Sequence, residues 1–207
     1  MKYNLDLEKL SAKTYMSIIK SQNLLPSRKI LLQNIEENFA FFERKEIQYV
    51  SQLRRSLSTP KKISSFAEES GISEEYLTIL KREMNSLEQK PVLISSFPDI
   101  DLELVSRLDE LGVRNSKDYW EQNLSESKEL LCLCDLVRIN GVGPIAAKVF
   151  YEAGYQSVSD VAEADAAVML EKTSAVNESR QYFKAKLGLK DMQFCIDFAS
   201  LLMKYCD

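Results

Sequence analysis

The 207-residue sequence contains no histidine. Histidine is the usual general acid or base near neutral pH and a common metal ligand. Its absence excludes Ser-His-Asp and Cys-His nucleophile systems, and it excludes zinc sites of the HExxH type. The sequence also lacks a phosphate-binding loop of the P-loop type. These absences indicate a protein that is not an enzyme and that requires no cofactor.

Glycine and proline are scarce as well, at six and five residues respectively. Turn-rich β-sandwiches use many residues of both types, so this scarcity favours helices joined by short connections. No segment has a convincing alternation of polar and apolar residues, which is the pattern of a half-buried strand. The sequence therefore predicts an all-α fold.

No apolar run is long enough to cross a membrane, and residues 1–20 lack the continuous apolar segment of a secretory signal. Cys132 and Cys134 form a close pair, but no second close pair completes a zinc site. Thiols of this kind are typical of buried positions in a reducing compartment. We expect a soluble, cytoplasmic protein with no membrane partner and no metal.

The formal net charge of −4 is unevenly distributed along the chain. Residues 1–100 carry 15 Lys and Arg against 13 Asp and Glu, whereas residues 101–207 carry 12 against 18. The basic pairs Arg54-Arg55 and Lys61-Lys62 flank a predicted chain break at Ser58-Thr59-Pro60. Attraction for a polyanion is therefore predicted in the N-terminal half.

Start signals and breaks predict how the helices are grouped. Pro26 is expected to begin a helix that continues through Lys45, because apolar residues recur there at intervals of three and four. A seam at Gln89-Lys90-Pro91 marks the predicted boundary between two domains. The first is an N-terminal helical domain over residues 1–90, and the second covers residues 91–207.

The second domain contains an internal repeat at an offset of 42 residues. The segment FPDIDLELVSRLDELGVRNSKDY aligns with INGVGPIAAKVFYEAGYQSVSDV, and Gly112 falls on Gly154. Each copy predicts a helix, a tight turn, a second helix, a glycine stop and then a capped helix. A fainter echo of the second half lies at residues 45–53. The repeat predicts a series of similar units, two of them within residues 93–177.

The turn in RINGVGPIAAKVFYEAG matches the helix-hairpin-helix pattern, in which two glycines flank an apolar residue before a helix. Gly141 and Gly143 are both expected to permit backbone angles or close approach that a Cβ would forbid. Val142 is predicted to fill the core between the two helices, and Pro144 suits the first helical turn. The amide groups at the start of such a helix form an anion site, which suits a backbone phosphate.

A compact corner between helices would use the same turn without binding anything, and that alternative stays open. The position after Gly143-Pro144, where a basic residue is common in DNA-binding hairpins, is occupied by Ile145. The nearest basic residues are Arg138, before the turn, and Lys148, one helical turn later.

The segment DLVRINGVGPIAAKVFYEAGYQSVSDVAEADAAVMLEKTSAVN, residues 135–177, resembles a family of bacterial and archaeal proteins of unknown function. That family is built from tandem helix-hairpin-helix units. The ending KLGLKDMQFCIDFASLL is similar to the family's closing helix. The resemblance implies an all-α fold of tandem helix-hairpin-helix units with an additional N-terminal helical domain. It also implies a link to nucleic acid, but no activity and no catalytic residues.

Two functions are consistent with these features. The first is non-enzymatic binding of a DNA or RNA backbone without sequence specificity. The alternative is a protein–protein adaptor or a self-associating homo-oligomer, which the acidic pI of about 5.2 favours. The predicted nucleic-acid-binding residues are Arg138, Gly141, Val142, Gly143 and Lys148 at the turn, with Arg54, Arg55, Lys61 and Lys62 in the N-terminal half.

Overall fold

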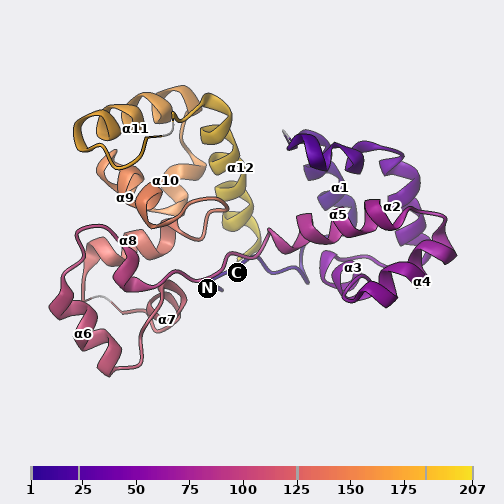
Figure 1. Ribbon diagram of the computed structural model, residues 1–207, viewed down its shortest axis with the longest axis horizontal. Coiled ribbons are helices and arrows are strands. Elements are labelled where there is room, and N and C mark those ends of the chain that lie inside the picture. The colour runs from indigo at the N-terminus through magenta and orange to yellow at the C-terminus, as the bar shows by residue number, and fades with distance from the viewer. Residues whose placement is uncertain (1, 23, 125, 185, 207) are drawn as a thin grey trace. The chain divides into compact units, whose positions relative to one another are not determined.

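A computed structural model describes residues 2–22, 24–124, 126–184 and 186–206, and these residues confirm the all-α class (Figure 1). Outside the helices, the described residues contain two isolated β-bridges and no strand. The chain divides into two compact units: Asp6–Glu88, and residues 2–5 together with 89–206. The ranges 1–90 and 91–207 stay a prediction about domains; the compact units differ from them chiefly in where residues 2–5 pack.

The Asp6–Glu88 unit is a cluster of short helices around an apolar core. Its core side chains include Tyr15, Leu31, Phe42, Leu53 and Leu80, all nearly or fully removed from solvent. Its elements are α1 (Ala12–Ser21), the 3₁₀ helix η1 (Pro26–Leu32), α2 (Ile35–Arg44), α3 (Val50–Ser56), α4 (Pro60–Ser70) and α5 (Glu74–Asn85).

The single helix predicted from Pro26 to Lys45 is divided in two. The 3₁₀ helix η1 ends at Leu32, and α2 begins after Asn34, whose φ of +46° lies in the left-handed region. The hydroxyl of Tyr76 donates a hydrogen bond to the carbonyl oxygen of Leu31 at 3.2 Å. That carbonyl would accept from Ile35 in a continuous α-helix, so the tertiary contact competes with helix continuation.

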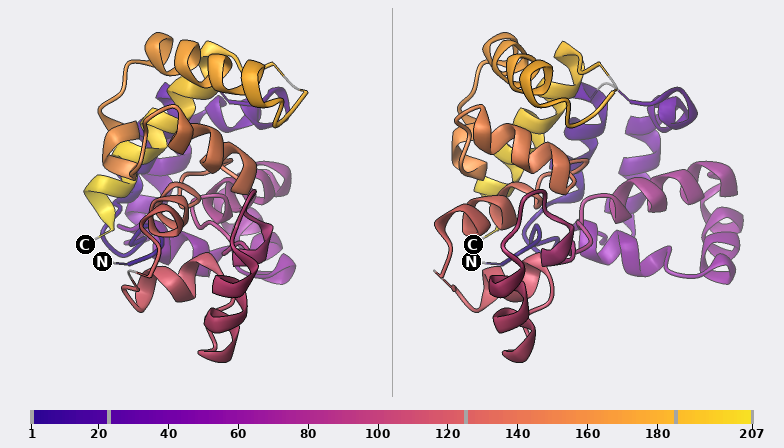
Figure 2. Two further views of the ribbon diagram at one scale, coloured as in Figure 1. Left: turned by 90° about the vertical axis from the view of Figure 1, so that its left-hand side faces the viewer. Right: turned by 60° about the vertical axis from the view of Figure 1, so that its left-hand side comes forward.

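The second unit, formed by residues 2–5 and 89–206, contains the Gly141 turn. Helix α12 packs against α10 and α11, as the yellow and orange ribbons show in both views of Figure 2. The elements of this unit are η2 (Ile94–Ser96), α6 (Leu102–Glu110), α7 (Ser116–Glu121), α8 (Lys128–Leu136), α9 (Pro144–Glu152), α10 (Val158–Ala162), α11 (Ala166–Arg180) and α12 (Leu189–Tyr205).

The 42-residue offset superimposes α6 on α9 residue for residue. Each helix is nine residues long and begins three residues after a residue with positive φ. Asp99, with φ of +57°, corresponds to Gly141, with φ of +83°. Gly112 and Gly154 stop the two helices with φ of +77° and +95°. The predicted helix before the turn is present in the second copy as α8, but the prediction is wrong for the first copy, whose corresponding residues 86–94 contain no α-helix. The tandem helix-hairpin-helix assignment therefore stays a prediction.

The weaker similarity at residues 45–53 corresponds to the same corner, in which a helix ends at a left-handed residue and a short second helix follows. Glu46 takes the place of the stop glycine with φ of +57°, and the amide of Ile47 bonds back to Phe42 at 3.0 Å. The equivalent bonds run from Val113 to Leu108 and from Tyr155 to Phe150 (2.8 and 2.9 Å). Bonds of this span are the 6→1 contacts of a Schellman motif. Among the residues that the structure describes, a helix, a left-handed stop and a short second helix thus follow each other at α2–α3, α6–α7 and α9–α10.

The first amide of the short second helix is paired differently in the third corner. In the first two corners, the amides of Val50 and Ser116 bond to main-chain carbonyls next to the isolated β-bridges. In the third, the amide of Val158 bonds to the Asp135 carboxylate at 2.8 Å. A buried side chain of α8 therefore replaces a main-chain acceptor, which fixes the start of α10 against α8.

Candidate functional site

The basic corner comprises Arg54, Arg55, Lys61 and Lys62, on both sides of the α3–α4 connection. Helix α3 ends at Ser56, and Thr59 caps α4 by accepting a hydrogen bond from the Lys62 amide at 3.2 Å. Pro60 then occupies the first helical position, where no amide hydrogen is needed. The predicted break therefore brings the two basic pairs onto neighbouring helix ends.

The four cations of the basic corner differ in how far they are engaged. Arg54 forms an ion pair with Glu88 at 2.7 Å, and Arg55 forms one with Glu8 at 3.2 Å. The Lys62 ammonium donates to the carbonyl oxygen of Arg55 at 3.0 Å. Within the described residues the exposed ammonium of Lys61 has no ion pair or hydrogen bond. Lys61 is thus the cation of the corner that is freest to meet an external anion.

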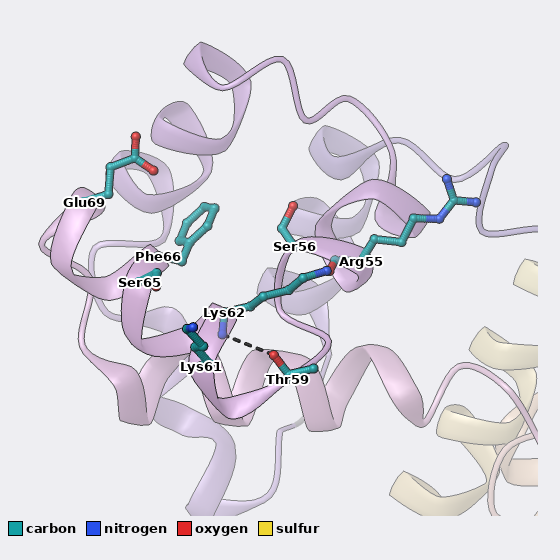
Figure 3. Close-up of a pocket in the computed structure, with 8 residues that line it drawn as sticks. All are labelled: Arg55, Ser56, Thr59, Lys61, Lys62, Ser65, Phe66 and Glu69. Atoms are coloured by element: carbon teal, nitrogen blue, oxygen red, sulfur yellow. Dashed lines mark hydrogen bonds between the residues drawn. The ribbon is translucent and has the colours of Figure 1, made fainter.

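An open hollow of about 680 Å³ lies beside this corner, and we call it the α3–α4 hollow (Figure 3). Figure 3 shows Lys62 extended toward the end of α3, whereas the Arg55 guanidinium points away from the hollow. The residues that line it are Arg55, Ser56, Thr59, Lys61, Lys62, Ser65, Phe66 and Glu69. Three of the four predicted basic residues are therefore part of one concave surface.

Phe66 and Glu69 complete the hollow, although neither was predicted from the sequence to be a site residue. Phe66 is half-buried and lies 5.7 Å, centroid to centroid, from the rings of both Phe41 and Phe42. Glu69 forms an ion pair with Lys45. Their spacing in the sequence could have indicated them. Phe66 lies four residues after Lys62, and Glu69 lies seven residues after Lys62, which places all three on one helix face.

The Gly141 turn is the second predicted contact. Gly141 has φ of +83°, so it needs glycine, whereas Gly143 has φ of −86° and nothing within 4 Å of an added Cβ. The expectation that both positions require glycine thus differs from the structure at Gly143. Val142 is buried, as predicted, with 6% of its surface exposed.

Helix α9 begins without a side-chain cap. In the described residues, the amides of Ile145 and Ala146 have no hydrogen-bond acceptor. The Ile145 side chain beside them is 45% exposed. In the aligned first copy, by contrast, the Asp101 carboxylate accepts from the Glu103 amide at 2.9 Å. The Ile145 amide at the α9 start is thus free, whereas the equivalent Glu103 amide at the α6 start is used internally.

Arg138 lies in the core and not beside the turn surface, with 2% of its surface exposed. Its guanidinium forms an ion pair with Asp135, donates to the carbonyl oxygen of Tyr3 at 2.9 Å, and stacks on Trp120 at 4.4 Å. Burial raises the pKa of Asp135, and Arg138 and the Val158 amide oppose that rise. Because its donors are used inside the protein, Arg138 anchors the N-terminal segment. The sequence-based expectation that it contacts a phosphate differs from this placement.

Lys148 is also buried, with 7% of its surface exposed. Its ammonium forms ion pairs with Glu129 of α8 and, at 3.8 Å, with Glu152 of α9. Arg180 and Tyr182 converge on the same Glu152 carboxylate at 3.4 and 2.7 Å. The ammonium of Lys148 is thus occupied by two carboxylates, unlike the sequence-based expectation that it contacts a phosphate.

The described residues offer no group of three or more Cys, Asp or Glu side chains that could hold a metal ion. The cysteines are free thiols. Burial raises the pKa of Cys132 and Cys134, and it raises the pKa of Cys195 to about 12. These three thiols stay protonated near neutral pH and are therefore weak nucleophiles and weak metal ligands.

Residues 105–200 match the family model described as "Domain of unknown function (DUF4332)". The expectation of a family of unknown function is thereby confirmed for this range. The range includes the Gly141 turn but leaves out the basic corner. The comparisons with curated proteins and with solved structures gave no match. Among the described residues, no helix is both long and apolar enough to cross a membrane.

Proposed function

We propose that this chain is a non-enzymatic protein that binds the phosphate backbone of DNA or RNA without sequence specificity. The observation that carries the proposal is the basic corner, where the unpaired ammonium of Lys61 stands beside Lys62 on one rim of a hollow. Lysine at such a place contacts phosphate as a point charge and reads no base. The resulting affinity depends on counterion release and falls steeply with salt.

The start of α9 supplies a second contact of a different kind. Its free amides and the positive end of the helix dipole attract a phosphate oxygen without any side chain. The C-terminal half carries 12 Lys and Arg against 18 Asp and Glu, so its overall field repels a polyanion. The α9 start therefore contributes less to affinity than the basic corner.

Charge-matched variants test the basic corner. We expect Lys61→Gln combined with Lys62→Gln to weaken binding to every nucleic-acid sequence and to lower the salt slope by up to about 2. The matched control combines Lys13→Gln with Lys29→Gln, because both are exposed cations of the same unit outside the corner. Equal losses for the two pairs would show that net charge, and not the corner, is responsible.

The adaptor alternative is favoured by exposed leucines around α6. Leu93, Leu102 and Leu111 are 60, 75 and 61% exposed, and large apolar side chains exposed within one short stretch of sequence can serve as contact points for a partner. A concentration-dependent rise in mass, measured by light scattering and abolished by Leu102→Ser with Leu111→Ser, would support this alternative.

A further inference from the structure

Three residues that line the α3–α4 hollow follow each other along one face of α4. Lys62, Phe66 and Glu69 lie at positions i, i+4 and i+7 of α4, so a cation, an aromatic ring and a carboxylate follow each other along the helix. At 1.5 Å per residue, the seven-residue separation spans roughly 10 Å, the scale of one nucleotide. The volume of about 680 Å³ lies within the usual range for small-ligand sites.

The two ends of the hollow differ in charge. Lys61 and Lys62 stand at the start of α4, where the helix dipole is also positive, so a phosphate is attracted to this end. Glu69 stands at the other end, where its ion pair with Lys45 leaves no net positive charge to attract a phosphate. A bound nucleotide therefore has one favourable direction, with its phosphate at the lysines and its base toward the middle of the hollow.

The middle of the hollow presents an aromatic side chain. Phe66 packs against Phe41 with the ring planes 77° apart and against Phe42 at 58°, which holds the ring from the core side. Its remaining surface faces the hollow (Figure 3). Stacking of a base on such a ring requires an open base face, and bases inside a duplex have both faces covered by their neighbours.

We propose that the α3–α4 hollow binds one unpaired nucleotide of single-stranded DNA or RNA, with its phosphate at Lys61 and Lys62 and its base stacked on Phe66. This inference rests on the proposed function and narrows it from any nucleic-acid backbone to an exposed single strand. A positively charged groove next to an aromatic ring is the general arrangement for sequence-tolerant single-strand binding.

The test measures binding of the full-length protein to four labelled ligands of equal length at about 50 mM salt, where phosphate contacts are strong. The ligands are single-stranded DNA, single-stranded RNA, duplex DNA and a DNA strand without bases. We expect both single strands to bind more tightly than the duplex or the strand without bases. If one single strand binds more tightly than the other, DNA or RNA is thereby identified as the preferred ligand.

Variants of the ring complete the test. Phe66→Leu should weaken single-strand binding at least about fivefold and leave duplex binding unchanged. Phe66→Tyr, which keeps the ring, should retain single-strand binding. Phe39→Leu is the matched control, because Phe39 belongs to the same aromatic cluster through Phe42 but does not line the hollow. Thermal unfolding of each variant separates loss of fold from loss of binding.

The outcomes distinguish this inference from the proposed function. If the unmodified protein binds the strand without bases as tightly as the normal strand, stacking is absent and the inference is overturned. The same conclusion follows if Phe66→Leu leaves single-strand binding unchanged. In both cases the proposed function stands as long as Lys61→Gln with Lys62→Gln weakens all four complexes. If none of the four ligands binds, both proposals fail.

Discussion

Gly141 and Gly143 flank the same valine, but only Gly141 has a backbone conformation that disfavours a side chain. Gly141→Ala forces a Cβ into the left-handed region and should lower the free energy of unfolding by about 1–2 kcal/mol. Gly143→Ala keeps an ordinary φ and an open surrounding, so its effect should stay within about 1 kcal/mol of zero. Urea unfolding of both variants measures the difference, and equal losses would contradict it.

Arg138 is expected to matter for stability through its buried ion pair with Asp135. Arg138→Leu leaves the Asp135 carboxylate buried without a charge partner, at a cost of about 3–5 kcal/mol. The matched control is Arg114→Leu, whose exposed ion pair with Asp109 contributes about 1 kcal/mol or less. Denaturant unfolding curves of the two variants provide the measurement. If Arg138→Leu is as mild as Arg114→Leu, the anchoring role is wrong.

At the scale of single helices, the start of α9 can be probed without disturbing the core. Ile145→Glu places a carboxylate beside the free amides, where the helix dipole tolerates or favours it, so stability should change by less than about 1 kcal/mol. The same carboxylate repels phosphate and should weaken nucleic-acid binding. Ile145→Gln, of the same size but neutral, is the control. Unchanged binding in Ile145→Glu would remove the α9 start from the proposed contact surface.

The elements also show which features local sequence patterns determine. The turn signals and the repeat were sufficient for the all-α class and for the match of α6 with α9, because caps and left-handed stops act within a few residues. The division between η1 and α2 could not be predicted, because it depends on Tyr76, more than 30 residues away in the chain.

The candidate site was predictable only in part for the same reason. The charge count indicated the residues of the basic corner, and the predicted break at Ser58-Thr59-Pro60 lies between its two pairs. The burial of Arg138 depends on Tyr3, 135 residues earlier, and that of Lys148 depends on Glu129 of another helix. No local pattern distinguishes such a buried cation from one that faces solvent.

At the scale of the whole molecule, residues 2–5 belong to the unit formed with residues 89–206. The Tyr3 hydroxyl and Ser116 form a hydrogen bond of 2.7 Å, and Asn4 exchanges hydrogen bonds with Gln89. Deletion of residues 1–5 should therefore destabilise that unit by at least about 3 kcal/mol, since the large buried ring of Tyr3 is lost.

Amide hydrogen exchange measures this effect in each unit separately. We expect faster exchange in α7 and α8 of the truncated protein and little change in α5, which belongs to the Asp6–Glu88 unit. A uniform increase in exchange over both units would contradict the assignment of residues 2–5 to one of them.

The central claim is that the chain binds a nucleic-acid backbone through exposed cations, and the salt dependence of that binding tests it most directly. The measurement is the affinity of the unmodified protein for mixed-sequence DNA and RNA between about 50 and 200 mM salt. We expect weak binding at low salt that is similar for unrelated sequences. The logarithm of the affinity should fall linearly with the logarithm of the salt concentration. Absence of binding to both DNA and RNA at about 50 mM salt, or an affinity independent of salt, would contradict it.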